Sequence, residues 1–211
     1  MGMAFAIAGQ ARERGRGMIY IMRHGQTDMN KARVLQGRSD YPLNAVGIAQ
    51  AKRVGEAFQK QGIVFDAVFS SPLSRAFKTA SLASLGKEVQ TDPRIMELYC
   101  GPYEGMDLNN LPPELEAFFA DFIHVPAPRG MEPLEDIVKR VGNFLEDLKK
   151  EVQGKNVLIA THAIAMKGAL EYLTPESKGA YWSKKVSNCE VYATELVQGN
   201  YLVPKPFLRE N

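Results

Sequence analysis

Short apolar runs alternate along the chain with longer segments in which apolar residues recur every three or four positions. The runs at residues 19–22, 64–69 and 156–160 end at polar or charged residues, which is typical of buried strands. Residues 191–203 predict closing strands. The segments between these runs are expected to form helices.

Two of the predicted helices lie on either side of the second strand. Asn44 is a favoured N-cap residue and Gly62 a stop, and between them four apolar residues share one helical face: Val46, Ala51, Val54 and Phe58. The dipeptide Ser71-Pro72 places a capping residue before a proline in a first turn. This dipeptide predicts the start of the second helix, whose inward face is formed by four apolar residues: Leu73, Ala76, Phe77 and Ala80.

The clearest helix runs from about Pro133 to Val152, and Gly154 ends it. Its apolar residues keep a period of about 3.6 residues: Leu134, Ile137, Val138, Val141, Phe144, Leu145 and Leu148. A further helix is expected over residues 163–172. The alternation of strands and helices predicts an α/β fold, a three-layer α/β/α sandwich with a mostly parallel central sheet.

Charge and length narrow the function classes. The 211 residues fit one domain, and the net charge of +2 comes entirely from residues 1–16, since the remainder is balanced. Because residues 17–211 have equal numbers of basic and acidic side chains, no excess positive charge is available to bind nucleic acid or an anionic membrane. Neither is therefore expected as a partner. In residues 1–17 an apolar patch precedes the charges, the reverse of a secretory signal. We interpret these residues as a disordered leader or an expression remnant, and expect a cytoplasmic protein.

The two cysteines, Cys100 and Cys189, are far apart in the sequence and have no Cys/His spacing typical of a metal site. They are interpreted as free thiols, and no metal or other cofactor is expected.

Candidate catalytic and binding residues follow the ends of three predicted strands, at Arg23-His24-Gly25, at Ser70-Ser71-Pro72 and at Thr161-His162-Ala163. Because the carboxyl ends of parallel strands meet at one sheet edge, His24 and His162 are expected to lie together there. Arg75, one turn into its helix, is expected near Arg23. Two guanidinium groups with helix N–H groups suit a phosphoryl group, although either arginine alone is equally consistent with a surface ion pair.

Residues 21–30, Ile-Met-Arg-His-Gly-Gln-Thr-Asp-Met-Asn, resemble the signature of the histidine phosphatase (phosphoglycerate mutase-like) superfamily. The resemblance continues in order as far as about residue 190, through Gln36-Gly37, Asp40-Tyr41-Pro42-Leu43-Asn44, Gly47, Gln50-Ala51, residues 70–76, Thr79-Ala80, Glu97-Leu98, Gly101, Glu104-Gly105 and Thr161-His162. The Arg-His-Gly triplet alone is a weak signal, but the ordered set is highly specific. It implies a phosphoglycerate mutase-like fold in a single domain over residues 18–211.

The resemblance also implies roles for the matched residues. His24 would be the nucleophile that accepts the phosphoryl group, and Glu97 would protonate the leaving alkoxide and then activate water. Three side chains would hold the phosphoryl oxygens: Arg23, Arg75 and His162. The remaining contacts with the phosphate would come from Asn30, Gln36, Gly37 and Ala163. Departures from the family occur at Ala163, usually glycine, and at residues 131–133, Met-Glu-Pro in place of Gly-Glu-Ser, and both bear on substrate geometry.

Residues 102–131 are expected to form a small helical lid above the substrate. Their apolar residues recur at helical spacing, so this helix either packs on the domain or brings one ring to the leaving-group pocket: Leu111, Leu115, Phe118, Phe119 and Phe122. Mutases of the family typically carry a longer, basic insert with a Trp-Arg-Arg stretch. This segment is acidic apart from Arg129, and the one tryptophan is Trp182.

We therefore expect a phosphomonoester hydrolase acting on a small phosphorylated metabolite through a phosphohistidine. Two alternatives stay open, phosphoglycerate mutase activity and a catalytically weak module that binds phosphorylated ligands. The sequence leaves the natural substrate open, and also whether the chain forms a homodimer.

Overall fold

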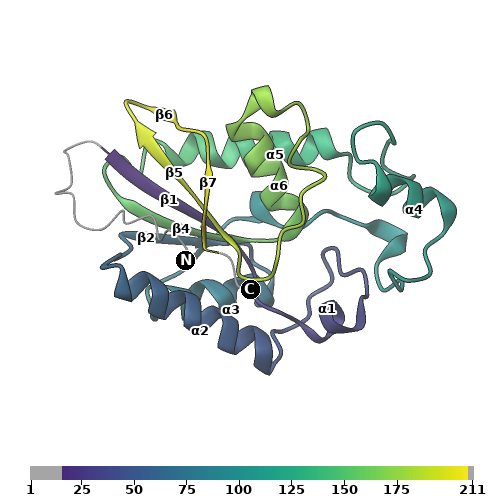
Figure 1. Ribbon diagram of the computed structural model, residues 1–211, viewed down its shortest axis with the longest axis horizontal. Coiled ribbons are helices and arrows are strands. Elements are labelled where there is room, and N and C mark those ends of the chain that lie inside the picture. The colour runs from purple at the N-terminus through teal and green to yellow at the C-terminus, as the bar shows by residue number, and fades with distance from the viewer. Residues whose placement is uncertain (1–15, 209–211) are drawn as a thin grey trace, which may run out of the picture.

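The computed structural model describes residues 16–208, which form a central seven-stranded sheet with helices on both faces (Figure 1). The strand order is β3-β2-β4-β1-β5-β6, and β7 also pairs with β5. The strands are β1 (Arg16–Arg23), β2 (Ala67–Ser70), β3 (Gln90–Thr91), β4 (Asn156–Thr161), β5 (Val191–Val197), β6 (Asn200–Tyr201) and β7 (Lys205–Leu208). The pairs within β1 to β4 are parallel and β5 runs antiparallel to β1, which confirms a mostly parallel sheet.

Two helices cover each face of the sheet (Figure 1). The helices α2 (Ala45–Lys60) and α3 (Ser74–Ala83) pack on one face, and α5 (Leu134–Leu148) and α6 (Ala163–Leu173) on the other. Alternate residues of β1 enter the two cores, Ile19 and Ile21 on the α5 and α6 side, Tyr20 and Met22 on the other. The predicted three-layer α/β/α sandwich is therefore confirmed.

The remaining helices are short and lie in the connections. They are α1 (Asp28–Ala32), α4 (Pro113–Ala120) and three 3₁₀ turns at Pro93–Ile95, Gly101–Tyr103 and Pro175–Ser177. The predicted leader lies outside the described residues except for Arg16 and Gly17, which belong to β1. Within the described part of the chain, no helix is both long and apolar enough to span a membrane.

Two of the predicted inward faces are each wrong at one position. In α2 the Asn44 cap is confirmed, because its side chain accepts a hydrogen bond from the backbone N–H of Gly47. Gly47 occupies the inward position four residues before Ala51, so the neighbouring Val46 points outward and is 51% exposed. In α3, Phe77 is exposed for the same reason, one position beyond the buried Ala76.

The predicted starts of α3 and β2 are also wrong. The helix begins at Ser74, whose N–H donates to Asp40, three residues after the expected cap at Ser71. Ser71 instead lies buried in the loop before the helix, where its hydroxyl accepts from the N–H of Leu73. The strand β2 begins at Ala67, and Val64 is exposed.

A contact between two backbones fixes the loop after β1 against the start of α2. A Cβ atom on Gly25 would collide with the backbone of Gly47, and a Cβ atom on Gly47 would collide with the backbone of Gln26. Only hydrogen side chains fit at these two positions. The loop that carries His24 is thus positioned by close packing on the first turn of α2.

Gly47→Ala is expected to destabilise the protein by about 1–3 kcal/mol, because the added methyl group must push the backbone of Gln26 away. Urea denaturation measures this change. The matched control is Val46→Ala in the same turn, which removes an exposed side chain and should change the free energy of unfolding by less than about 0.5 kcal/mol. A Gly47→Ala protein as stable as wild type would contradict the close packing.

Candidate active site

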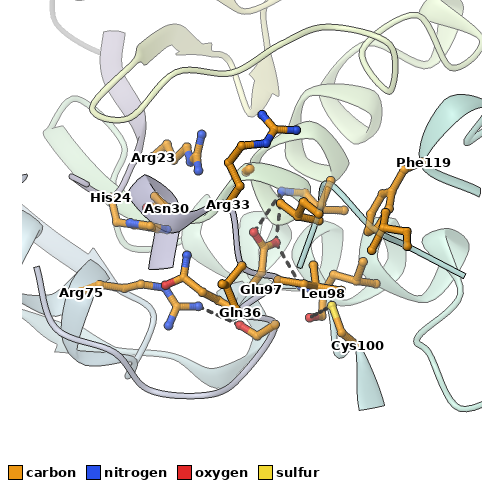
Figure 2. A pocket seen from close by; sticks show the side chains of 17 residues that line it. Arg23, His24, Asn30, Arg33, Gln36, Arg75, Glu97, Leu98, Cys100 and Phe119 are labelled. Atoms are coloured by element: carbon orange, nitrogen blue, oxygen red, sulfur yellow. Dashed lines mark hydrogen bonds between the residues drawn. The ribbon is translucent and has the colours of Figure 1, made fainter. Parts of the chain in front are cut away.

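A cavity of about 350 Å³ opens where β1 and β4 end and α3 and α6 begin (Figure 2). Every predicted site residue except His162 lines it: Arg23, His24, Asn30, Gln36, Gly37, Arg75, Glu97 and Ala163. Topology brings these residues together from segments far apart in the sequence. The expectation that the strand ends meet at one sheet edge is confirmed.

His24 is held in one tautomer by the backbone. Its Nδ1 lies 2.7 Å from the carbonyl oxygen of Gly25. A carbonyl oxygen only accepts hydrogen bonds, so Nδ1 must carry the proton and donate it. The ring is 2% exposed, and burial, together with the charges of Arg23 and Arg75, holds the pKa of His24 well below its usual range. The ring is therefore neutral at physiological pH, and Nε2 bears a free lone pair.

His162 lies beside His24, with the two ring centroids 5.1 Å apart. Its side chain is fully buried, its Nε2 lies 2.8 Å from the hydroxyl oxygen of Ser71, and its Nδ1 has no hydrogen-bond partner within residues 16–208. Burial and the charges of Arg75, His24 and Arg23 also lower the pKa of His162 strongly. His162 thus packs against His24, and its role in holding the phosphoryl oxygens stays a prediction.

Two buried neutral histidines make stability depend on pH. An unfolded histidine titrates near pH 6.5, whereas the pKa of His24 and that of His162 lie well below this value in the fold. Below about pH 6.5 the unfolded chain binds more protons than the native chain, so stability is complete above about pH 7.5 and is lost as the pH falls. The loss is expected to reach about 1.4 kcal/mol per pH unit for each histidine.

Urea denaturation at pH 7.5 and 5.5 tests this dependence. Replacing His24 by Asn should reduce the difference between the two pH values. The control is His124→Asn, since the side chain of His124 is 77% exposed. An unchanged difference in His24→Asn would contradict the assignment of a neutral ring.

Two arginines from different elements flank His24. Arg23 donates from Nη1 to the carbonyl oxygen of Val186 at 2.6 Å. Arg75 donates from Nη1 to Ser39 O at 2.8 Å and from Nη2 to Gly37 O at 2.7 Å. The Nε atoms of both arginines are buried and lack a partner within residues 16–208. Because an unsatisfied buried donor costs free energy, these groups point to an anionic ligand in the cavity.

Within the described residues neither arginine forms an ion pair, so both keep their charge for a ligand. Burial lowers the pKa of Arg75, and Glu97 opposes that effect. The alternative of a surface ion pair is thereby excluded for Arg75, which is 1% exposed.

The helix α1 and the loop after it supply further donors to the cavity. The hydroxyl of Thr27 donates to Gln36 Oε1 at 2.9 Å, which leaves the Gln36 amide N–H groups for a ligand. Asn30 Oδ1 accepts from the N–H of Thr27 and from Asn188, which likewise leaves its amide N–H groups for a ligand. Gly37 has a left-handed φ of 52°, and a Cβ atom there would collide with the carboxylate of Glu104. Gly37 therefore packs closely against Glu104 at this side of the cavity.

Glu97 lies at the N-terminus of α6, on the opposite wall of the cavity (Figure 2). Its Oε1 accepts hydrogen bonds from the N–H of Ile164 at 3.0 Å, of Ala165 at 3.1 Å and of Leu98 at 3.0 Å. Its carboxylate thus satisfies the first N–H groups of a helix whose N-cap residue, His162, makes no side-chain cap within the described chain. Ala163, the departure from the family pattern, lines the cavity directly beside these groups.

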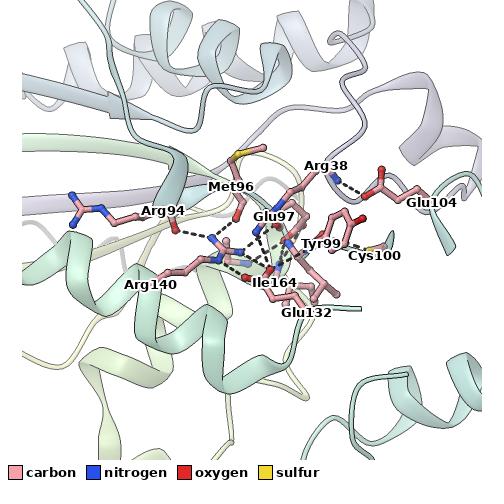
Figure 3. Close-up of polar contacts among 12 residues, drawn as sticks. Arg38, Arg94, Met96, Glu97, Tyr99, Cys100, Glu104, Glu132, Arg140 and Ile164 are labelled. Carbon is pink, nitrogen blue, oxygen red and sulfur yellow. Dashed lines mark hydrogen bonds and ion pairs between the residues drawn. The ribbon is translucent and has the colours of Figure 1, made fainter. Parts of the chain in front are cut away.

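A network of charged side chains holds the Glu97 segment from behind (Figure 3). Arg140 on α5 and Arg38 each donate to the backbone oxygen of Glu97 at 3.2 Å. The carboxylate of Glu132 forms ion pairs with both arginines, with Arg140 Nε at 2.7 Å and with Arg38 Nη2 at 3.2 Å. It also accepts a hydrogen bond from the N–H of Tyr99. Glu132 therefore keeps a role although its neighbours depart from the family pattern. The sequence analysis did not predict Arg140, whose only signal is its place eight residues after Glu132.

The side of the cavity beyond Glu97 is mostly apolar. Eight residues form this wall: Val34, Leu35, Leu98, Cys100, Leu108, Leu111, Phe119 and Ile164. Leu115 and Phe118 of α4 are fully buried in the core, whereas Phe119 turns toward the cavity. The helix of the 102–131 segment therefore packs on the domain and also brings one ring to the cavity, and the role of that ring toward the leaving group stays a prediction. Arg33 also lines the cavity, and the sequence analysis did not predict it.

No cluster of three or more His, Cys, Asp or Glu side chains suited to a metal ion occurs between residues 16 and 208. Cys100 and Cys189 are buried and form no disulfide within the described residues, and burial raises the pKa of Cys100 strongly.

The sheet edge, the neutral histidine and the two guanidinium groups define a site suited to phosphoryl transfer. Residues 19–205 match the model of the histidine phosphatase superfamily (branch 1). The chain belongs to the histidine phosphatase superfamily. It is 31% identical to phosphoglycerate mutase-like protein 4 of Arabidopsis thaliana over 189 residues, which cover 86% of this chain and 80% of that protein.

Solved structures of similar proteins include phosphatases. A mutant of phosphoserine phosphatase from Entamoeba histolytica in complex with phosphoserine has 25% sequence identity and a TM-score of 0.76, and the match covers 89% of this chain and 94% of that chain. The same enzyme in complex with 3-phosphoglyceric acid has a TM-score of 0.80 at 23% identity, covers 92% of this chain and 98% of that chain, and supports the fold. Both matches agree with the phosphoglycerate mutase-like architecture predicted from the sequence.

Proposed function

We propose that this protein hydrolyses phosphomonoesters of small metabolites through a phosphohistidine on His24. The observation that carries the proposal is the Nδ1–H donation to Gly25 O, which leaves Nε2 unprotonated in a cavity flanked by two arginines. A neutral imidazole with a fixed free lone pair is a suitable nucleophile for phosphorus. A similar solved structure is a phosphoserine phosphatase, which supports the hydrolysis of a phosphomonoester.

In the first step Nε2 of His24 attacks phosphorus, the N–P bond forms and the P–O ester bond breaks. Glu97 in its protonated form gives its proton to the leaving oxygen, which departs as an alcohol. Arg23 and Arg75 stabilise the negative charge on the three other phosphoryl oxygens, with Asn30 and Gln36 as further donors.

In the second step water attacks the phosphohistidine, and the Glu97 carboxylate takes a proton from it. The N–P bond breaks, inorganic phosphate leaves, and His24 returns to its neutral state. In this proposal residues 102–131 form the lid, and α4 closes the leaving-group side through Phe119.

Hydrolysis is favoured over the mutase alternative by the charges around the cavity. A mutase must hold a second phosphoryl group, which requires a second cluster of cations. Opposite the arginine pair the cavity wall is apolar, and Arg33 is the one further cationic side chain among the described residues that line it.

A screen of small phosphomonoesters with a phosphate-release readout tests the proposal. Free phosphate is expected to appear in step with loss of the ester, without transfer to a second hydroxyl group. Isomerisation of monophosphoglycerate faster than phosphate release would contradict the proposal and support phosphoglycerate mutase activity. Tight binding of phosphorylated ligands without turnover would contradict the proposal and support a module that binds phosphorylated ligands.

A further inference from the structure

Lys167 is a buried cation for which the described chain provides no counter-ion. It lies on α6 and is 8% exposed. Its Nζ donates a hydrogen bond to the carbonyl oxygen of Trp182 at 2.7 Å and lies 5.1 Å from the centre of the Phe122 ring. Within residues 16–208 it forms no ion pair, and two of its three N–H groups have no hydrogen-bond partner.

The environment of Lys167 favours an anionic partner. Burial lowers the pKa of its ammonium group to about 8, an effect that the charge of Glu97 opposes and that of Arg23 strengthens. Glu97 is not an ion-pair partner of Lys167, because its carboxylate accepts hydrogen bonds from the N–H groups of Ile164 and Ala165. Buried charges are normally paired, since an unpaired buried charge costs free energy. A bound anion would supply the charge that the surrounding side chains do not.

Lys167 lines a cavity of about 280 Å³, which we call the second cavity. Three aromatic side chains contribute to its wall: Phe119, Phe122 and Trp182. The exposed Lys184 and Lys185 also line it, and neither forms an ion pair with another described residue. The second cavity therefore combines an aromatic wall with three cations.

The acidic groups at the second cavity do not balance these cations. Asp121 supplies the one carboxylate among the described residues that line it, and this carboxylate accepts a hydrogen bond from His124 Nδ1 at 2.8 Å. Phe119 also lines the catalytic cavity, whereas neither His24 nor the two arginines beside it line the second cavity. The second cavity is therefore a separate place for a ligand, with one ring between it and the catalytic cavity.

We propose that the second cavity binds a small carboxylate with an aromatic body, whose carboxylate group contacts Lys167 and whose ring packs against the aromatic wall. The inference goes beyond the proposed function and does not depend on turnover. A planar ring suits a wall of aromatic side chains. One carboxylate suits an ammonium group that already uses one of its N–H groups. The exposed Lys184 and Lys185 add a weaker attraction that solvent screens.

The probe is phenylacetate, and the reporter is the fluorescence of Trp182, the one tryptophan in the chain. In wild type, phenylacetate should change this fluorescence in a saturable way. It should bind about tenfold or more tighter than phenylacetamide, its uncharged isostere, because the amide loses the charge-assisted hydrogen bond. Acetate should also bind about tenfold or more weakly than phenylacetate, because it has no ring to bury.

Two variants test the contact with Lys167. Lys167→Met keeps an unbranched side chain beside Phe122, and the amide of Lys167→Gln can still donate to the carbonyl oxygen of Trp182. In each variant the affinity ratio of phenylacetate to phenylacetamide should fall to near 1. The matched control Lys139→Met makes the same change at an exposed position on α5 and should leave the ratio unchanged.

A ratio near 1 in wild type overturns the inference without any variant, and so does a ratio that Lys167→Met or Lys167→Gln leaves unchanged. Equal affinities for acetate and phenylacetate overturn the aromatic part. Inorganic phosphate has no ring and should not displace phenylacetate. Competition between the two would place the carboxylate in the catalytic cavity and also overturn the inference. The proposed function is judged separately, by hydrolysis of p-nitrophenyl phosphate.

Discussion

His24→Ala is expected to lower kcat for phosphomonoesters by about 10⁴-fold or more, because the nucleophile is lost and no other group takes its place. His162 is the nearest imidazole, but its ring is fully buried and does not line the cavity. Arg23 and Arg75 are held by backbone carbonyl oxygens and not by His24, so the anion site stays intact. The variant should therefore still bind inorganic phosphate with an affinity within about tenfold of wild type.

Steady-state turnover and isothermal titration with inorganic phosphate measure the two effects separately. The control is His124→Ala, which removes an exposed histidine far along the chain and should retain full activity. Residual turnover in His24→Ala above about 1% of wild type would mean that another group attacks phosphorus.

Glu97→Gln is expected to lower kcat by about 10²- to 10⁴-fold, because the amide can neither give a proton to the leaving oxygen nor take one from water. The substitution preserves shape, and the amide oxygen can still accept from the N–H groups of Ile164 and Ala165. Affinity for inorganic phosphate should therefore change less than about threefold. With p-nitrophenyl phosphate, whose leaving group needs no proton, the first step should be much less affected than with an alkyl ester.

Rapid-quench and steady-state kinetics with both esters separate these steps. Glu135→Gln, at an exposed position on α5, is the matched control and should behave as wild type. Equal weakening of turnover and of phosphate affinity would contradict the acid and base roles of Glu97.

The positions that the sequence predicted correctly depend on local pattern and chain order. Apolar runs located the strands, and a polar residue directly after such a run lies at the carboxyl edge of the sheet, as His24 does. Arg75 followed from its place in the first part of a helix that starts at that edge, even though the predicted cap was two residues early.

The errors arose where helical phase or tertiary contact decides the outcome. Val46 and Phe77 are apolar residues one position beyond the buried face, and only the packing of α2 and α3 on the sheet shows this. His162 follows its strand and lies beside His24 as expected, but its hydrogen bond with Ser71 could not be predicted from residue spacing. The position of a ring relative to a cavity is not encoded in the spacing of residues.

Residues that act through long-range contacts gave no signal in the sequence. Arg140 reaches the backbone of Glu97 from a helix 43 residues later in the chain. Nothing in the sequence distinguishes Arg33 from the other arginines. Its left-handed backbone conformation and its hydrogen bond with Asn109 are known only from the structure. Both depend on how the 97–110 segment lies against other elements of the fold.

The most direct test of the account is to trap the enzyme during a single turnover with a ³²P-labelled phosphomonoester, quench it in alkali and map the label by peptide sequencing. The account predicts a label that is stable in base, lost in acid and carried by the peptide with His24, and it should accumulate in Glu97→Gln with an aryl ester. A label on another residue, or phosphate release in wild type with no trappable label at any time, would contradict the account.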